Sequence, residues 1–270
     1  MLCKKYLIKY AWIVIISSLF VCSACNTSGN QQKETVAPAL PVESLRNFIL
    51  STASLTNIQS VSRLDSILIA AGKDSAFFHQ TVDFLEKPLS DPNSLYRNED
   101  LYIEVLKAIT QSPWYDSIGK IRPQHQLQLA MQNRIGNRAN DFTYVMPYGS
   151  HKRLYDVDAD HVLLFFYNPE CDACKNMKAA ITASQIITNH VASAKLKILA
   201  IYTDTNLALW RNHLSELPTK WIAGRDEGEY LYKNNIYDLR AIPTIYLLDR
   251  DKRVLLKDCM DIAKIEEKLL

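Results

Sequence analysis

The sequence lacks the features that mark several large protein classes. Its 31 basic and 29 acidic residues nearly cancel, and no stripe of Lys and Arg residues indicates a nucleic-acid partner. Its apolar leader at 11–21 is shorter than the about 20 residues that a membrane-spanning helix needs. Its six histidines form no His-x3-His pair, so ligands for a zinc site are scarce. These absences argue against nucleic-acid binding, a membrane-spanning helix in the leader and a structural zinc.

Residues 1–24 have the organisation of a secretory signal peptide, in which three lysines precede the apolar run. Small residues stand directly before Cys25, an arrangement that resembles the lipobox of bacterial lipoproteins and implies a lipid on Cys25 after cleavage. Cys22, which stands where that pattern usually has Leu, is an alternative lipid acceptor. Simple cleavage to a secreted protein is a further alternative. Residues 25–41 are polar and contain prolines, so they predict a flexible tether.

The apolar residues between 42 and 136 recur at helical spacing and predict a domain of about five helices. The pattern is clearest from Leu101 to Ile109, where apolar residues fall at i, i+1, i+4, i+5 and i+8. His79 and His125 are isolated, and no nucleophile–base pair or metal-ligand spacing accompanies them. This part therefore predicts no activity of its own. We expect its helices to end near three breaking residues, Gly72, Pro88 and Gly136.

Strand and helix patterns alternate between 139 and 270. Two short segments flank a turn at 147–150 and predict a β-hairpin. Such alternation favours a mixed sheet covered on both faces, which is a three-layer α/β/α domain. The remaining expected elements are a helix from the Cys171 region to about Asn189, strands at 196–203 and 253–257, and a helix at 207–217.

A pair of cysteines follows a buried strand in the segment 163–175. The apolar run ends at Asn168-Pro169, and a helical pattern begins after it, so Cys171 is expected at a helix N-terminus. Free backbone N–H groups and the helix dipole favour a thiolate there, and the thiolate is the nucleophile in disulfide exchange. Cys174, one turn later, is close enough to close a disulfide with it. Half of a zinc site or an inert structural disulfide are the alternatives.

A second segment, 239–249, contains Pro243 at the start of an apolar strand. Together with the cysteine pair, the Ile242-Pro243-Thr244 sequence resembles the thioredoxin superfamily over residues 139–270. The resemblance implies a cis bond between Ile242 and Pro243, facing the cysteines, with backbone that binds an incoming peptide. It also implies that this proline blocks metal capture by the thiols. An ordinary trans proline at a strand edge is the alternative.

The longer spacing of these motifs resembles the TlpA/ResA branch of that superfamily. This resemblance implies a protein disulfide as substrate, a membrane-embedded thiol donor, and no cofactor apart from the redox-active Cys171–Cys174 disulfide. The helical part, in its segments 88–101 and 132–142, resembles an uncharacterised domain found ahead of thioredoxin-like domains in Gram-negative lipoproteins. No activity comes with that second resemblance.

Three positions depart from the thioredoxin pattern: Glu170 stands before the pair, Ala173 before its second cysteine, and Phe165 where thioredoxins place a buried acid. The proton acceptor for Cys174 is therefore not identified. Asp172 and Glu170 are candidate replacements, and solvated loop charges are the equal alternative.

The direction of exchange follows from two opposing charge effects at Cys171. An Asp172 carboxylate about 7 Å away disfavours the thiolate by roughly 1 kcal/mol. The helix N-terminus favours it by about 0.3–1 kcal/mol. Because these effects nearly cancel, we expect a reducing couple.

The sequence therefore predicts a thiol–disulfide oxidoreductase, most simply a reductase, that is lipid-anchored in the cell envelope and faces the periplasm. Cys171 attacks the substrate and Cys174 resolves the mixed disulfide. Cys259, left without a partner, is expected to be a small buried core residue. A non-catalytic lipoprotein that uses the fold as a binding platform, or a disulfide isomerase if the chain is dimeric, are the alternative functions.

Overall fold

The structure is a computed structural model that describes residues 42–270, all of which lie in one compact unit, Ala37–Leu270. The predicted signal peptide, the tether and Cys25 lie outside the described residues. The predicted boundaries of the helical and α/β domains stay predictions. Within the described part of the chain, no helix is both long and apolar enough to cross a membrane.

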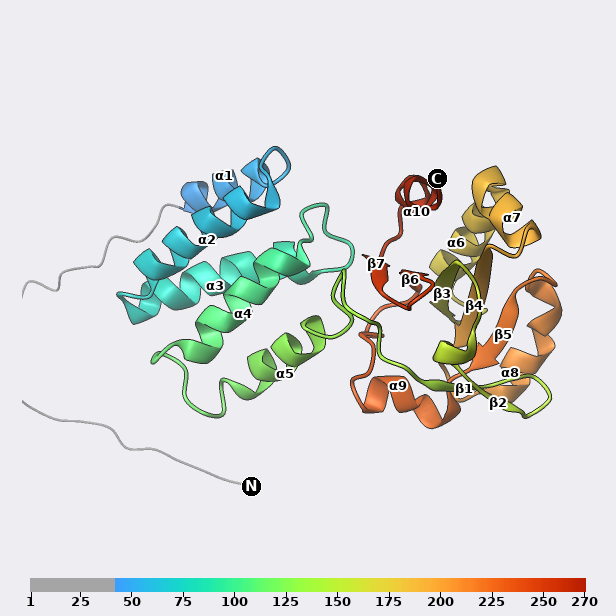
Figure 1. The fold of residues 1–270 in the computed structure, drawn as a ribbon. Coiled ribbons are helices and arrows are strands. Elements are labelled where there is room, and N and C mark those ends of the chain that lie inside the picture. Colours follow the sequence, from blue (N-terminus) through green and yellow to red (C-terminus); the bar gives the residue numbers. More distant parts are fainter. Residues whose placement is uncertain (1–41) are drawn as a thin grey trace, which may run out of the picture. The chain divides into compact units, whose positions relative to one another are not determined.

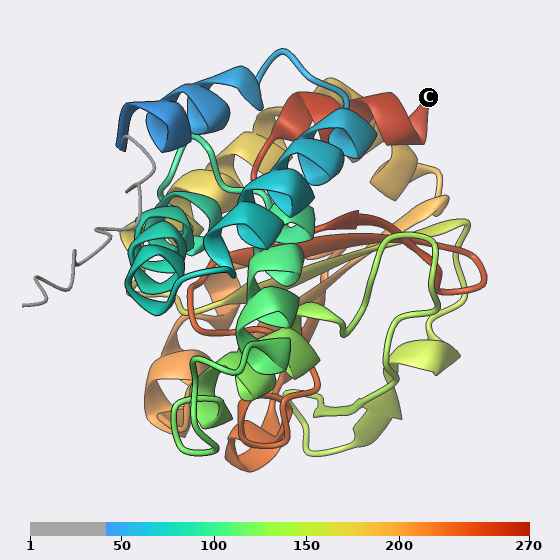
Figure 2. The same ribbon diagram turned by 90° about the vertical axis from the view of Figure 1, so that its left-hand side faces the viewer.

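Five helices form the first part of the described chain (blue to green in Figure 2). Side-chain caps start three of them: Thr56 forms a reciprocal capping box with Gln59, and Asp74 and Asn98 each accept a backbone N–H. One face of each of the middle helices packs into a shared apolar core that includes the Leu101–Ile109 pattern. The helices are α1 Val42–Ser51, α2 Asn57–Ala71, α3 Ser75–Ser90, α4 Glu99–Gln111 and α5 Ile121–Ala130.

Two of the predicted helix ends are wrong. α3 continues past Pro88 to Ser90, because Leu89 is fully buried in the core and holds the last turn in place. α5 ends at Ala130, well before Gly136. The chain turns there through Asn133, whose φ is 50° and whose side-chain amide donates to the Ile236 carbonyl at 2.8 Å.

A seven-stranded mixed sheet forms the centre of the second part, in the order β2-β1-β5-β4-β3-β6-β7 (Figure 1). β3, β4 and β5 are parallel, and the other pairs are antiparallel. The predicted hairpin is present as β1 and β2. The strands are β1 Thr143–Val145, β2 His151–Arg153, β3 His161–Tyr167, β4 Leu196–Tyr202, β5 Ile222–Arg225, β6 Thr244–Asp249 and β7 Val254–Lys257.

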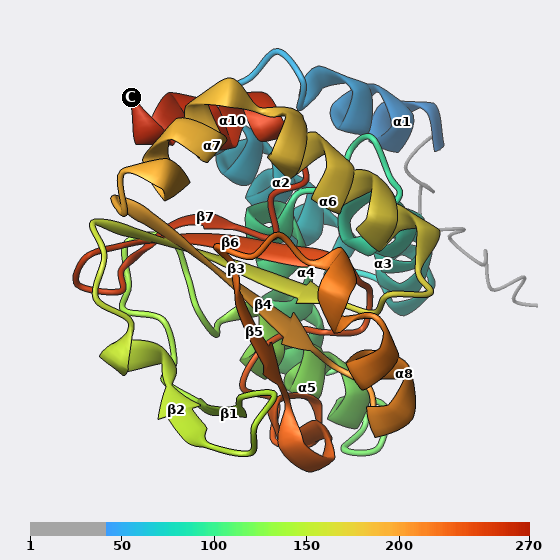
Figure 3. The ribbon, with the colours of Figure 1, turned by 90° about the vertical axis from the view of Figure 1, so that its right-hand side faces the viewer.

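The two faces of the sheet bury alternate residues of β3. Leu163, Phe165 and Tyr167 pack against helices on one face, where Figure 3 shows α6, α7 and α10 together. Phe166 and every second residue before it on β3 pack on the other face of the sheet. Their neighbours there are Tyr237, α9 and the segment that follows α5. The predicted fold class, a helical region followed by an α/β domain with a mixed sheet, is thus confirmed. The helices of this part are α6 Asp172–Ala183, α7 Gln185–Ala192, α8 Leu207–Asn212, α9 Tyr230–Lys233 and α10 Ile262–Leu269.

Two long helices predicted in this part are each interrupted. The helix after Cys171 does not run to Asn189, because Ser184 ends α6 and its hydroxyl caps the start of α7 at Ile187. The helix expected at 207–217 ends at Asn212 and is followed by a short 3-10 turn, Leu214–Glu216. Short 3-10 turns also occur at Leu154–Asp156 and Glu227–Glu229.

Candidate active site

Cys171 occupies the N-cap position of α6, directly after the loop that leaves β3. Its backbone is extended there, and the N–H of Cys174 donates to its sulfur at 3.2 Å. The side chain is half-buried, and its Sγ lies 3.7 Å from the Ile242 carbonyl oxygen. The predicted placement at a helix N-terminus is therefore observed, with one N–H group aimed at the sulfur.

Cys174 lies one turn further along α6 and faces the core. Its side chain is only 2% exposed, and both cysteines are free thiols. Burial raises the pKa of the Cys174 thiol to about 12, and its hydrogen bond with Cys171 acts in the same direction. Only Cys171 is thus placed to meet an incoming disulfide, whereas Cys174 is placed to react with Cys171.

Ile242 and Pro243 face Cys171 across the end of the sheet. The register pairs Phe166 of β3 with Thr244 of β6, which brings the residues before β6 next to the loop after β3. The Ile242–Pro243 peptide bond is cis, as the family resemblance implies. Thr244 donates its hydroxyl to the Ala241 carbonyl at 2.7 Å and so holds this loop. The structure therefore brings the residues of both motifs together.

The two acidic residues considered as proton acceptors point away from the buried thiol. The Asp172 side chain is 91% exposed and lies 3.2 Å from the Lys175 ammonium. Glu170 is exposed as well. Phe165, at the position of the missing buried acid, is fully buried among apolar residues. Both acids are solvated charges, and neither meets Cys174.

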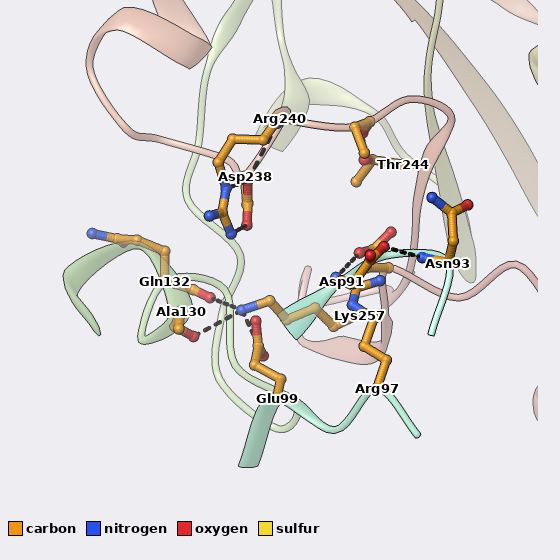
Figure 4. Close-up of polar contacts among 12 residues, drawn as sticks. Asp91, Asn93, Arg97, Glu99, Ala130, Gln132, Asp238, Arg240, Thr244 and Lys257 are labelled. Carbon is orange, nitrogen blue, oxygen red and sulfur yellow. Dashed lines mark hydrogen bonds and ion pairs between the residues drawn. The ribbon is translucent and has the colours of Figure 1, made fainter. Parts of the chain in front are cut away.

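A cavity of about 480 Å³ lies beside the Ile242 loop, with Ala241 and Thr244 in one wall. Figure 4 shows Thr244 and Arg240 of this wall. The Arg240 guanidinium donates two hydrogen bonds to the Asp238 carboxylate, at 2.8 and 2.6 Å. Burial alone would raise the pKa of Asp238, but the Arg240 guanidinium outweighs it and lowers that pKa. The opposite wall comes from α3 and α5, where Arg122 and Glu86 are paired at 3.0 Å.

The walls of this cavity cannot be recognised in the amino-acid sequence. They combine residues of the helical region with the Arg240–Thr244 loop, more than a hundred positions later in the chain. No local pattern connects such distant segments, so only their contacts in the folded chain reveal them.

Cys259 is half-buried and packs against the core on the side of α10, with its Sγ 3.6 Å from the Asp261 carbonyl oxygen. Burial raises the pKa of this thiol. Among residues 42–270, no group of three or more His, Cys, Asp or Glu side chains is arranged to hold a metal ion.

Comparison with solved structures reveals a relative over most of the chain. A thioredoxin-like protein from Bacteroides caccae is 37% identical with a TM-score of 0.80, covering 87% of this chain and 84% of that protein. The C-terminal domain of an uncharacterized protein from Bacteroides fragilis is 43% identical, covers 51% of this chain and 97% of that domain, and has a TM-score of 0.49. The thioredoxin domain of a thiol-disulfide oxidoreductase from Bacteroides vulgatus is 18% identical and has a TM-score of 0.44. That match covers 51% of this chain and 99% of that domain.

The helical region matches a family model as well. Residues 31–133 match a domain of unknown function, DUF5106. This match confirms the resemblance of that region to an uncharacterised domain. No curated protein matches the chain.

Proposed function

The chain belongs to the family of thioredoxin-like proteins, and from this premise we propose that it is a thiol–disulfide oxidoreductase that reduces protein disulfides. The observation that carries the proposal is the position of Cys171. Its sulfur is half-exposed at a helix N-terminus, 3.2 Å from the Cys174 N–H and 3.7 Å from the Ile242 carbonyl oxygen. A nucleophile, a resolving thiol and a backbone site for substrate are thus within one small region.

In the proposed reaction, the Cys171 thiolate attacks one sulfur of a substrate disulfide. A mixed disulfide forms, and the other substrate sulfur leaves as a thiolate. Cys174 then attacks Cys171, so the Cys171–Cys174 disulfide forms and the second substrate sulfur is released. The substrate gains two electrons, and a thiol donor must later reduce Cys171–Cys174. Ile242 and Pro243 present the backbone against which the substrate peptide lies.

The reducing direction is supported by the charges around Cys171. A strong oxidant needs a strongly stabilised thiolate in its reduced form. The Cys174 N–H and the helix dipole favour that thiolate, whereas the Asp172 carboxylate in the same turn opposes it. Lys175 lies 3.2 Å from Asp172 and weakens this opposition without removing it.

We propose an envelope location on the basis of the N-terminal sequence. The signal-peptide pattern at 1–24 and the small residues before Cys25 support export and a lipid on Cys25. The spacing between Cys171 and Pro243 supports the TlpA/ResA branch. A periplasm-facing enzyme of that branch receives its electrons from a membrane-embedded thiol donor.

Insulin reduction tests the proposed activity. The reduced protein should precipitate insulin chains in the presence of a thiol donor, and Cys171→Ser should abolish this activity. Cys174→Ser should instead accumulate a mixed disulfide with insulin, detectable by mass spectrometry. Cys259→Ser is the matched control, because this half-buried thiol lies outside the site and its loss should leave activity unchanged. If the unmodified protein does not reduce insulin and Cys174→Ser forms no mixed disulfide with it, these results would support a binding platform instead.

A further inference from the structure

The resolving step requires a proton acceptor that the two motifs do not provide. Cys174 is buried with a raised pKa, so its thiol holds its proton at neutral pH. The central strand offers Phe165 where thioredoxins have an acid, and Asp172 is turned to solvent. A base must therefore reach Cys174 from another element.

A small cavity connects Cys174 with the segment after α8. Its volume is about 10 Å³, and its walls include Tyr167, Lys178, His213 and Glu216 beside Cys174. A space of about 10–15 Å³ accommodates the centre of one water molecule. These four residues carry the polar groups that a water there needs as hydrogen-bond partners.

The tautomer of His213 leaves one ring nitrogen free to act as a base. Its Nδ1 lies 2.8 Å from the Leu209 carbonyl oxygen. A carbonyl only accepts hydrogen bonds, so Nδ1 carries the proton and Nε2 of the neutral ring carries the free lone pair. The His213 side chain is about one-third exposed. A proton taken up on the cavity side can therefore pass to solvent.

Glu216 is positioned to stabilise the protonated ring. Its Oε1 lies 3.7 Å from His213 Nε2, and its Oε2 lies 3.3 Å from Lys178 Nζ. Lys178 also donates to the Glu216 backbone carbonyl at 3.2 Å. Because Lys178 follows Cys174 by four residues on α6, its ammonium lies on the same helix face and favours a Cys174 thiolate. Lys178 thus links the redox helix to the Glu216 carboxylate.

Tyr167 is not the base. Burial raises the pKa of its hydroxyl far above neutral pH, and the charges of Cys174 and Glu216 raise it further. The hydroxyl therefore keeps its proton at neutral pH.

We propose that His213 accepts the Cys174 proton through one water molecule in this cavity and that Glu216 stabilises the resulting imidazolium. This inference rests on the proposed function and adds its proton acceptor. Cys174 loses its proton to His213 Nε2, and the thiolate attacks Cys171 in the mixed disulfide. The Cys171–Cys174 bond forms, the bond from Cys171 to the substrate sulfur breaks, and the substrate leaves as a thiolate. His213 then releases its proton to solvent.

Stopped-flow reaction of the reduced full chain with the aryl disulfide DTNB separates the two steps. The first release of thionitrobenzoate reports attack by Cys171, and the second reports attack by Cys174 on the mixed disulfide. His213→Gln keeps a polar side chain without a titrating base. It should slow the second phase on the order of 100-fold at pH 7 and leave the first phase unchanged. An unchanged first phase also shows that the variant is folded.

The pH profile distinguishes proton transfer from a structural effect. In the unmodified protein the second phase should accelerate as the pH rises, because the base must be unprotonated to accept the Cys174 proton. The charged and titratable groups facing His213 across the cavity are Lys175, Lys178, Glu216, Tyr167 and Cys174. His213→Gln should remove this acceleration. Glu216→Gln should keep it but slow the second phase, because the imidazolium loses the carboxylate that stabilises it.

His190→Gln is the matched control. His190 makes the same bond to the carbonyl four residues earlier, with Nδ1 2.9 Å from the Ile186 oxygen, but on α7. Both phases should stay at the unmodified rate in this variant. A second phase in His213→Gln that matches the unmodified protein in rate and pH profile would overturn the inference alone. Absence of both phases in the unmodified protein would instead refute the proposed function.

Discussion

The Lys257 ammonium lies 2.9 Å from the Glu99 carboxylate and joins strand β7 to the start of α4. It also donates to the backbone carbonyls of Ala130 at 2.9 Å and Gln132 at 2.7 Å (Figure 4). The side chain is 7% exposed, so its three donors have three acceptors inside the protein. Burial lowers the pKa of Lys257, and Glu99 opposes this change. The helical region is thus bound to the sheet through one satisfied buried charge.

Lys257→Met should lower the free energy of unfolding by about 1–3 kcal/mol, because the Ala130 and Gln132 carbonyls lose their donor. The partly exposed Glu99 carboxylate keeps the Arg134 guanidinium, 3.1 Å away. Urea unfolding followed by circular dichroism measures the change. Lys264→Met removes an exposed lysine that lies 3.8 Å from Asp261 and should change stability by less than about 0.5 kcal/mol. Equal effects of the two substitutions would show that Lys257 does not tie the regions together.

Alkylation should distinguish the two cysteines of the site. At pH 8, iodoacetamide should modify Cys171 in the folded reduced protein and leave Cys174 unmodified, because the Cys174 pKa is raised to about 12. The sign for stability follows from the same shift. The raised pKa stabilises the folded state below about pH 9, and this stabilisation is lost as the pH rises toward 12. Peptide mass spectrometry measures the labelling, and both thiols should react in urea. Equal labelling of both thiols without urea would contradict the buried position of Cys174.

Asp226 should make stability pH-dependent through its burial. Its side chain is 3% exposed and accepts the Leu231 N–H at 3.0 Å, and burial raises its pKa to about 6. Because this carboxyl has a raised pKa in the folded state, it stabilises that state at pH values below 3.8, its pKa in the unfolded chain. This stabilisation is lost as the pH rises through about 6. Relative to the unmodified protein, the free energy of unfolding of Asp226→Asn should therefore increase by up to about 3 kcal/mol between pH 4 and pH 8.

Thermal unfolding at both pH values measures this difference. Asp65→Asn, at an exposed position of α2, is the control and should follow the unmodified protein at both pH values. A parallel pH response of Asp226→Asn and Asp65→Asn would contradict the expected burial effect.

The midpoint potential should be close to that of thioredoxin, about −270 mV, and far from the about −120 mV of a dedicated oxidant. The reason is that the Cys171 thiolate is not strongly stabilised, because one N–H donates to the sulfur and no cationic side chain contacts it among the hydrogen bonds and ion pairs of residues 42–270. Because Asp172 is exposed and paired with Lys175, Asp172→Asn should raise the potential by less than about 20 mV. Equilibration with thiol redox buffers measures both values. A potential near −120 mV would contradict the reducing direction and leave the exchange chemistry intact.

The sequence predicts the parts of this site that local patterns encode. The apolar run before Cys171 can only be a buried strand, and Asn168-Pro169 ends it, so the position of Cys171 follows from its neighbours alone. The same reasoning fails at Ser184, because a serine inside an apolar periodic stretch does not reveal that its hydroxyl caps a new helix. His213 and Glu216 are invisible for another reason. They lie about forty positions after Cys174, and only the packing of the segment after α8 against α6 brings them to its cavity.

The cavity beside Ile242 should affect protein substrates more than small disulfides. Ala241 is exposed, lines this cavity, and precedes the residue whose carbonyl lies 3.7 Å from the Cys171 sulfur. A polypeptide bound along Ile242 must pass this point, whereas a small disulfide needs only the sulfur. Ala241→Trp should therefore raise KM for insulin about tenfold, a loss of about 1.4 kcal/mol of binding, and leave the first DTNB phase unchanged.

Ala179→Trp provides the matched control, because Ala179 is an exposed alanine on α6 away from the cavity walls. It should change neither insulin reduction nor the DTNB reaction. If Ala241→Trp slowed both reactions equally, the tryptophan would be acting on Cys171 itself. If it slowed neither, substrate peptides would approach the sulfur from another side of the Ile242 loop. Selective loss with insulin alone would place the substrate chain between this loop and the helical region, because both supply walls of the same cavity.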